Sequence, residues 1–290
     1  MNYSCRLTLG MPHTNRRGFP EVELMKQAGH AQWQAIAAAI GRPLSTLRTV
    51  AGGEVYAGFY YIETVVPPTA PLESFRVDDT ISFDVSLRAF KNISLEGRVR
   101  VRRVDGGAPT DGPDIRFATI FMTPVSGNNE LKVAPPAGVD CNGIPPLPND
   151  ENPFNQTRAA REDGTLNLFT ESWREAGRHF EFPYQIDRDR DTNGAGLVYF
   201  ANYIAFSDAA ERALDAVERG AAGERSLRHR RIAYYGNADI DDRLTVRTTV
   251  FVNPASPEQA GYRHVVVRQR DAALICLSEV IKAAEAPLRA

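Results

Sequence analysis

The sequence predicts an α+β protein made of two tandem units, each an antiparallel sheet wrapped around a long central helix. One observation behind this prediction is that both halves of the 290-residue chain hold the same order of elements: a long amphipathic helix, then about four extended runs. The other is that residues 134–164 are rich in proline and lack apolar periodicity, as expected of a connector. We therefore expect an N-terminal unit over residues 1–133 and a C-terminal unit over residues 165–290.

The first half opens with a predicted helix over residues 20–40. Apolar residues such as Leu24 and Ala28 recur there at spacings of three and four, and Gly41 and Pro43 end the pattern. Four strands are then expected, at residues 54–66, 80–90, 94–104 and 115–122.

The second half repeats this order after a short extended run at residues 180–186 and a turn-rich segment. Apolar positions that include Ile204, Phe206 and Leu214 predict a helix over residues 197–219. Four strands are expected at residues 231–235, 244–252, 262–269 and 272–281. Two such units can join their sheets edge to edge, so both a monomer and a homodimer would satisfy the sheet edges.

Composition excludes several classes of function. A formal net charge of -2 offers no general attraction to nucleic acid, and no apolar run is long enough to span a membrane. The N-terminus shows no basic segment followed by an apolar run, which favours a cytoplasmic protein. Three widely spaced cysteines, and histidines without a second ligand nearby, predict neither a disulfide framework nor a metal site.

A motif at the start of the second predicted helix carries a family resemblance. Residues 191–203 (DTNGAGLVYFANY) hold an acidic or amide residue, glycines, a Val-Tyr pair and Ala-Asn-Tyr. This segment resembles the entry to the central helix of hot-dog-fold thioesterases, and Phe206 and Glu211 also fit that pattern.

A narrower resemblance lies in the first half. The segments 10–13 (GMPH), 29–33 (GHAQW) and 55–59 (VYAGF) are similar to the bifunctional acyltransferase/decarboxylase of the leinamycin polyketide pathway and its relatives, which are double hot dogs. The resemblance implies decarboxylation of methylmalonyl-CoA and transfer of the propionyl group to the phosphopantetheine thiol of an acyl carrier protein. An acyl-CoA substrate and a carrier protein are thus the implied partners, and no further cofactor is implied.

The same resemblance implies an essential tyrosine in the first half. The Tyr-Ala-x-Phe context maps it to Tyr56, with Tyr60 and Tyr61 as alternatives. Gln32, placed among the substrate-binding residues, and Gly58 depart from the family pattern, which bears on the acyl preference.

Decarboxylation leaves an enolate, so charge on the thioester oxygen must be stabilised. A helix beginning at Leu197 would aim its N-terminal N–H groups and dipole there, Gly194 and Gly196 would allow close approach, and Asn193 would add an amide donor. Asp191 is a candidate base, which would favour hydrolysis instead. The alternative is an ordinary capped helix start.

Three further residues are candidates. His30, on the first predicted helix, could bind the substrate carboxylate or protonate the enolate; the alternative is a packed histidine. Arg228 and Arg230 belong to the densest basic cluster, residues 224–231, which could bind the 3′-phosphate of coenzyme A or a carrier protein; the alternative is a solvated loop.

Three functions follow. The first is a double hot-dog acyltransferase/decarboxylase that acts between an alkylmalonyl-CoA and an acyl carrier protein. The second is an acyl-CoA or acyl-carrier-protein thioesterase, or a dehydratase, of the same fold. The third is a non-catalytic scaffold that binds thioesters.

Overall fold

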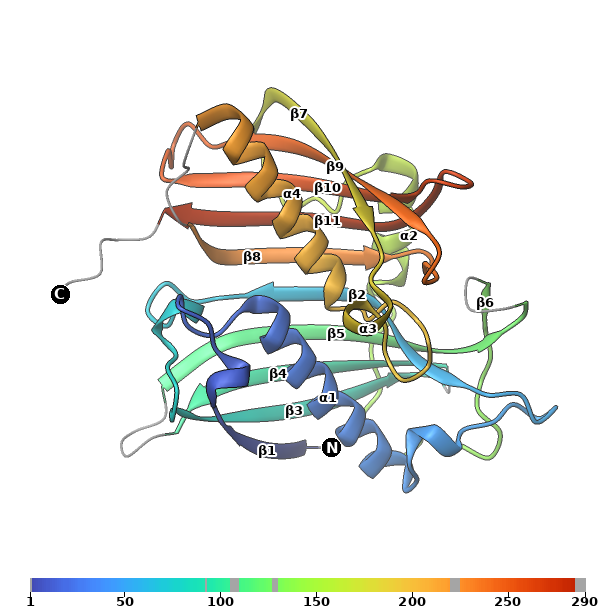
Figure 1. Cartoon of the computed structure of the whole chain (residues 1–290). Helices are drawn as coiled ribbons and strands as arrows, with labels where there is room; N and C mark the ends of the chain where they lie inside the picture. Colours follow the sequence, from blue (N-terminus) through green and yellow to red (C-terminus); the bar gives the residue numbers. More distant parts are fainter. Residues whose placement is uncertain (1, 92, 105–109, 127–129, 220–224, 285–290) are drawn as a thin grey trace. The chain divides into compact units, whose positions relative to one another are not determined.

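The computed structural model describes residues 2–91, 93–104, 110–126, 130–219 and 225–284. They form two compact units, which are Met1–Ala159 (unit 1) and Ala160–Ala290 (unit 2). Each unit is an antiparallel sheet with one long helix (Figure 1). Among the described helices, none combines the length and the apolar character needed to cross a membrane.

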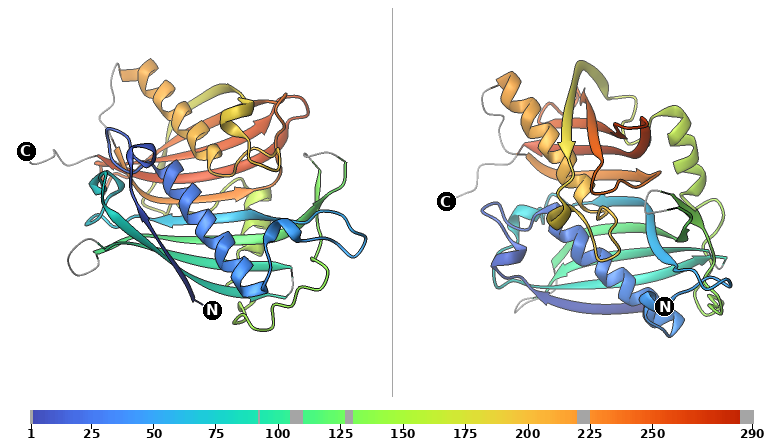
Figure 2. Two further views of the ribbon diagram at one scale, coloured as in Figure 1. Left: turned by 60° about the horizontal axis from the view of Figure 1, so that its bottom comes forward. Right: turned by 45° about the vertical axis from the view of Figure 1, so that its right-hand side comes forward.

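Unit 1 places its strands in the order β1-β3-β4-β5-β2, with the short β6 beside β5. Its helix α1 packs against β1, β3 and β4, and both views of Figure 2 show it lying across the strands. The elements are β1 (Asn2–Thr8), α1 (Glu21–Ile40), β2 (Tyr56–Val65), β3 (Thr80–Phe90), β4 (Ser94–Arg103), β5 (Thr110–Pro124) and β6 (Leu131–Val133), with single-turn helices at Met11–His13, Leu44–Thr46 and Leu72–Ser74.

Helix α1 follows from its apolar spacing. Leu24, Ala28, Ala31 and Ala35 lie at spacings of three and four and are buried on one face. The helix ends where Gly41 adopts a left-handed conformation (φ 71°) and its N–H donates to the Ala37 carbonyl. The predicted helix is confirmed to within one residue.

Unit 2 repeats the topology of unit 1. Its strand order is β7-β9-β10-β11-β8, so β7 corresponds to β1 and β8–β11 correspond to β2–β5. Helix α4 packs against β7 and β9. The elements are β7 (Arg174–Gln185), α3 (Arg188–Asp191), α4 (Asn202–Arg219), β8 (Arg225–Tyr234), β9 (Arg243–Val252), β10 (Gln259–Arg268) and β11 (Ala273–Ala284).

Several elements differ from the sequence predictions; among them, β7 and β8 each begin six residues earlier than expected. Strand β1 was not predicted, although Tyr3, Cys5 and Leu7 alternate with polar residues; none of its residues is buried. Part of the segment predicted as a connector is helical, as α2 (Phe154–Asp163); the Asn152 side chain accepts the Phe154 N–H where this helix begins. Helix α4 begins at Asn202 and not at Leu197, because the preceding residues form a hairpin.

Candidate functional site

The segment before α4 is a small hairpin that spans Asp191–Tyr199. The Tyr199 N–H donates to the Asp191 carbonyl, and the Asn193 N–H donates to the Leu197 carbonyl, both at 2.8 Å. Gly196, at the tip, has a φ of 72°, which side chains rarely tolerate. Gly196 therefore serves the turn itself, whereas the sequence suggested close approach of substrate.

The Asn193 side chain holds the tip of this hairpin together. Its Oδ1 accepts hydrogen bonds from the N–H groups of Ala195 at 3.0 Å and Leu197 at 3.1 Å. From the sequence, the Asn193 amide was expected to donate to a thioester. The structure shows instead that its carbonyl oxygen orders the backbone of the loop.

Gly194 is the exposed residue of this tip. A Cβ added there would meet no atom within 4 Å, and its backbone needs no left-handed conformation. Within the described part of the chain, the Gly194 N–H has no protein acceptor, whereas the N–H groups of Asn193, Ala195, Gly196 and Leu197 all have one. Gly194 thus presents a backbone donor at an open position.

Asp191, the first residue of the hairpin, is 2% exposed. Its carboxylate accepts from the Tyr184 hydroxyl at 2.8 Å, the Asp187 N–H at 2.9 Å and the Arg190 Nε at 3.2 Å. Burial and the Asp191 carboxylate raise the pKa of Tyr184 to about 12. These bonds make Asp191 an anchor of the hairpin and leave it poorly placed to activate water.

The expected helix dipole does not act at the glycines. Because α4 begins at Asn202, Gly194 and Gly196 lie more than a turn before its first residue, and the dipole effect fades within about one turn. That expectation was wrong, and the Gly194 N–H of the hairpin remains as the candidate donor.

The three candidate tyrosines of β2 have different surroundings. Tyr56 is half-buried, and its hydroxyl donates to the Glu54 carboxylate at 2.8 Å. Burial and that carboxylate raise the pKa of Tyr56, which disfavours a phenolate nucleophile. The Tyr60 hydroxyl is buried and donates to Asn152 Oδ1 at 2.9 Å, and Tyr61 is fully buried.

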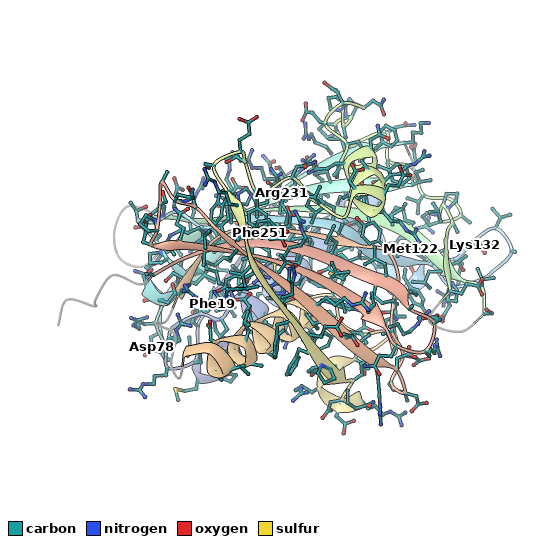
Figure 3. All side chains as sticks on the ribbon, turned by 90° about the horizontal axis from the view of Figure 1, so that it is seen from above. Phe19, Asp78, Met122, Lys132, Arg231 and Phe251 are labelled. Carbon is teal, nitrogen blue, oxygen red and sulfur yellow. The ribbon has the colours of Figure 1, made fainter. Side chains whose placement is uncertain are left out.

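His30 lies on α1 with an exposed side chain. Arg228 is half-buried in β8, and its Nη1 donates to the Leu227 carbonyl at 3.2 Å. Arg230 is 1% exposed and donates to Asp208 at 3.2 Å, so it is a core residue and cannot meet a phosphate at the surface. Arg231, labelled in Figure 3, donates to the carbonyl of Leu166 at 3.2 Å.

Gln32 lies inside unit 1, between α1 and the sheet. It is fully buried, and its Nε2 donates to Thr119 Oγ1 of β5 at 2.7 Å. Its Oε1 has no hydrogen-bond partner and lies against Gly97 of β4, where an added Cβ would come within 2.1 Å of it. The absence of a side chain at Gly97 therefore leaves the space that the Gln32 amide occupies.

We expect Gly97→Ala to lower the free energy of unfolding by about 1–3 kcal/mol, because the new methyl group overpacks against the Gln32 amide. Chemical denaturation measures this effect. In a Gln32→Ala background the same substitution should cost much less, since the clashing amide is gone. An unchanged penalty in that background would show that Gln32 is not the group that requires glycine.

Unit 2 carries a buried polar network between α4 and its sheet. Glu211 of α4 contacts His264 Nε2 at 3.0 Å and Lys282 Nζ at 2.7 Å. His264 Nδ1 is 3.0 Å from Thr248 Oγ1, and Lys282 also donates to Asp208 at 2.8 Å. The hydrogen bonds satisfy these groups, as burial requires.

Charges within this network shift its pKa values. Burial opposes ionisation of Glu211, but the Lys282 charge, the hydrogen bond with His264 and the Arg230 charge outweigh it and lower the Glu211 pKa far below its ordinary value. Burial lowers the pKa of His264, and the Glu211 carboxylate only partly offsets this. The folded unit therefore holds an ionised Glu211 beside a neutral His264.

Acidification should destabilise the protein because the depressed pKa values of Glu211 and His264 both favour the fold only at higher pH. A depressed carboxyl pKa stabilises the fold above about pH 4.5, and a depressed histidine pKa does so above about pH 6.5; both contributions disappear as the pH falls. We expect Tm to fall from pH 7 to pH 4, measured by differential scanning fluorimetry. A His264→Asn variant should lose the part of this fall that begins near pH 6.5. A Tm that rises on acidification would contradict the assignment.

The structure brings together some of the sequence candidates and separates others. Asp191, Asn193, Gly194, Gly196 and Leu197 share one hairpin of unit 2, whereas Arg230 belongs to the core of that unit. The Glu211–His264–Lys282 network was not identified from the sequence, although Glu211 had matched the hot-dog pattern. His264 and Lys282 are more than fifty positions from Glu211 and lie in strands without any recognisable motif.

No family model matches the sequence, and no curated protein matches it. Solved structures do share the fold. A putative oleoyl thioesterase from Lactobacillus plantarum has a TM-score of 0.70 and 13% identity, covering 99% of this chain and 97% of its own.

Two more solved structures align over nearly the whole chain. A 12:0-ACP thioesterase from Umbellularia californica has a TM-score of 0.64 at 12% identity, covering 98% of both chains. An acyl-ACP thioesterase from Bacteroides thetaiotaomicron has a TM-score of 0.62 at 13% identity, covering 97% of both chains. These neighbours are hot-dog-fold thioesterases, so the predicted hot-dog fold is confirmed.

Proposed function

We propose that this chain is a double hot-dog enzyme that hydrolyses acyl thioesters of coenzyme A or of an acyl carrier protein. Of the solved structures that match almost its entire length, two are named as thioesterases of acyl-carrier-protein substrates and one as a putative oleoyl thioesterase. The repeated strand order of the two units supports the double arrangement, because each unit holds the strands of one hot dog.

The observation that carries the chemistry is the exposed Gly194 N–H at the tip of a braced hairpin. In hydrolysis, water bonds to the thioester carbon and negative charge grows on the carbonyl oxygen; the carbon–sulfur bond then breaks, and the thiolate takes up a proton. A fixed N–H donor stabilises that oxygen. The bonds to Asn193 and Asp191 hold this donor in place before substrate arrives.

A methyl group at Gly194 tests this assignment. The Gly194→Ala variant should keep its Tm, because the added Cβ meets no protein atom, but lose at least about tenfold in kcat/KM by blocking close approach of the thioester. Gly143→Ala is the matched control, since its Cβ also meets no atom within 4 Å. Equal kcat/KM for both variants and the wild type would remove Gly194 from the site.

A second candidate is decarboxylating transfer of an acyl group from an alkylmalonyl-CoA to a carrier protein. The bonding of Asp191 favours it, because loss of carbon dioxide needs a stabilised enolate oxygen and no carboxylate to activate water. Tyr56, half-buried with its hydroxyl on Glu54, is then the proposed group for acyl transfer.

Product analysis separates the candidates. The protein is incubated separately with oleoyl-CoA, with lauroyl carrier protein, and with methylmalonyl-CoA plus holo carrier protein. The products are identified by mass spectrometry. Free acids support hydrolysis; a propionyl mass gain on the carrier, reduced at least about a hundredfold by Tyr56→Phe, supports transfer. Acyl-CoA binding without any turnover would overturn both and favour a scaffold.

A further inference from the structure

Strand β1 is the outer strand of the unit 1 sheet. It pairs with β3 along all seven of its residues, and among the described residues no other strand pairs with it. The Leu9 N–H donates to the Asp79 carbonyl at 2.8 Å and continues this ladder. Because hydrogen-bonded positions alternate in an antiparallel pair, the odd-numbered residues of β1 bond to β3, and the even-numbered residues turn their N–H and C=O groups outward.

This edge lacks the features that protect exposed edges in folded proteins. Protected edges carry proline, several charged side chains or bulges, which prevent pairing with another chain. The corresponding strand of unit 2, β7, contains Pro183, a left-handed Gly177 (φ 66°) and a break in its register. In contrast, β1 contains neither proline nor glycine, its register has no shift, and Arg6 is its one charged residue. The difference favours pairing of β1 with a further strand.

The side chains of β1 indicate a core that is incomplete at this edge. Tyr3, Cys5 and Leu7 lie opposite three residues of β3 that are at most 2% exposed. Residues directly opposite each other in antiparallel strands share a face, so these three side chains belong to the core face of the sheet. All three are nevertheless only half-buried. A further strand with apolar residues at every second position would cover them, and β1 itself has this pattern.

We propose that β1 pairs antiparallel with β1 of a second copy of this chain, so that the unit 1 sheets of the two copies become continuous. Pairing centred on Cys5 places Tyr3 opposite Leu7, uses all seven residues and keeps every apolar side chain on the core face. Ser4 then lies opposite Arg6, and the outward N–H and C=O groups of the even-numbered residues bond to each other. Pairing centred on Arg6 would instead oppose two like charges and leave residues unpaired.

The proposed contact is symmetric, as in most homodimers, because the same strand serves both copies. A single strand pair is a small interface, so we expect a dimer that dissociates on dilution. None of the residues of β1 belongs to the hairpin proposed for thioester chemistry. The dimer and the proposed function can therefore fail separately.

Disulfide trapping tests the pairing. In the proposed register the two Cys5 residues meet at a non-hydrogen-bonded position, where Cα atoms are about 4.5 Å apart and a disulfide can form. Oxidation with copper–phenanthroline should therefore give a covalent dimer on a non-reducing gel, as the two thiols lose two protons and two electrons to the copper oxidant. Cys5→Ser should abolish this dimer, because Cys141 and Cys276 are buried.

Thr8→Cys in the Cys5→Ser background is the control for register. Thr8 is exposed, but in the proposed pairing the two copies of this residue lie at opposite ends of the ladder, about 20 Å apart. This variant should cross-link at least about tenfold more slowly than the wild type, because its sulfurs are too far apart. Equal rates for the two proteins would show random collision and overturn the proposal.

Arg6→Pro tests the backbone bonds. The Arg6 N–H faces away from β3, so proline there removes a hydrogen bond of the dimer and none within unit 1. Arg6→Thr is the matched control, since it removes the same charge but keeps the N–H. In sedimentation velocity over a concentration series, Arg6→Pro should weaken dimerisation at least about tenfold, and Arg6→Thr should match the wild type.

Circular dichroism checks that these variants remain folded; if Arg6→Pro does not, the trapping experiment decides alone. A wild type that stays monomeric at every concentration, or a folded Arg6→Pro variant that dimerises as tightly as Arg6→Thr, would overturn the proposal. Neither result depends on thioester turnover.

Discussion

Glu211→Ala is expected to lower the free energy of unfolding by about 3–5 kcal/mol, one of the two largest effects that the structure predicts. Glu211 is the shared partner of His264 and Lys282, and Lys282 is only 13% exposed on its side chain. Removing the carboxylate leaves a buried ammonium group with Asp208 as its remaining carboxylate partner. Urea denaturation monitored by circular dichroism measures the loss.

Two further variants test whether the loss of stability comes from the buried charge of Glu211. Glu211→Gln keeps the shape of the side chain and a hydrogen bond for His264 but not the charge, so its cost should be intermediate. Glu181→Ala breaks the exposed Glu181–Arg247 pair, with side chains 66% and 58% exposed, and should cost about 1 kcal/mol or less. If Glu211→Ala costs no more than Glu181→Ala, the network does not stabilise unit 2 as described.

Asn193→Ala is expected to lower kcat/KM at least about a hundredfold while Tm changes little. The substitution removes the acceptor that binds the N–H groups of Ala195 and Leu197, so the hairpin no longer holds the Gly194 donor in one position. We therefore propose Asn193 as a positioning residue, and a thioester assay with released thiol as the readout measures its effect.

The conservative variant decides what Asn193 does. A carboxylate can accept both N–H groups, so Asn193→Asp should restore most of the activity. If the side-chain amide donated directly to the substrate, Asn193→Asp would be as inactive as Asn193→Ala. That outcome would contradict the positioning role and restore the donor role that the sequence suggested.

Much of the fold could be predicted from local patterns. Helix α1 has its apolar residues at spacings of three and four and a glycine at its end, and both signals lie within the helix itself. Strand β1 was missed although its apolar residues alternate; its partner in the sheet is β3, about eighty positions away. Helix α4 was predicted too long, because hydrophobic residues of the hairpin, such as Leu197 and Val198, extended its apolar pattern.

The site was predictable only in part, for a physical reason. The motif around Asp191 and Gly194 is contiguous, so it could be recognised in the sequence as a candidate site. The roles within it depend on hydrogen bonds that a motif does not contain, such as those of Asn193 Oδ1. Arg230 belonged to a basic cluster in the sequence, yet its pairing with Asp208 buries it. Charge in a sequence does not reveal exposure when the partner lies on another element.

Oxygen-18 labelling tests the central claim, hydrolysis of an acyl thioester, most directly. The protein is incubated with oleoyl-CoA or lauroyl carrier protein in water enriched in oxygen-18, and the masses of the acyl products are measured by mass spectrometry. Hydrolysis predicts a free acid that has gained one heavy oxygen from the solvent, formed at least about tenfold faster by the wild type than by Gly194→Ala. An acyl group that appears only on a carrier thiol, or no turnover of any thioester, would contradict the account.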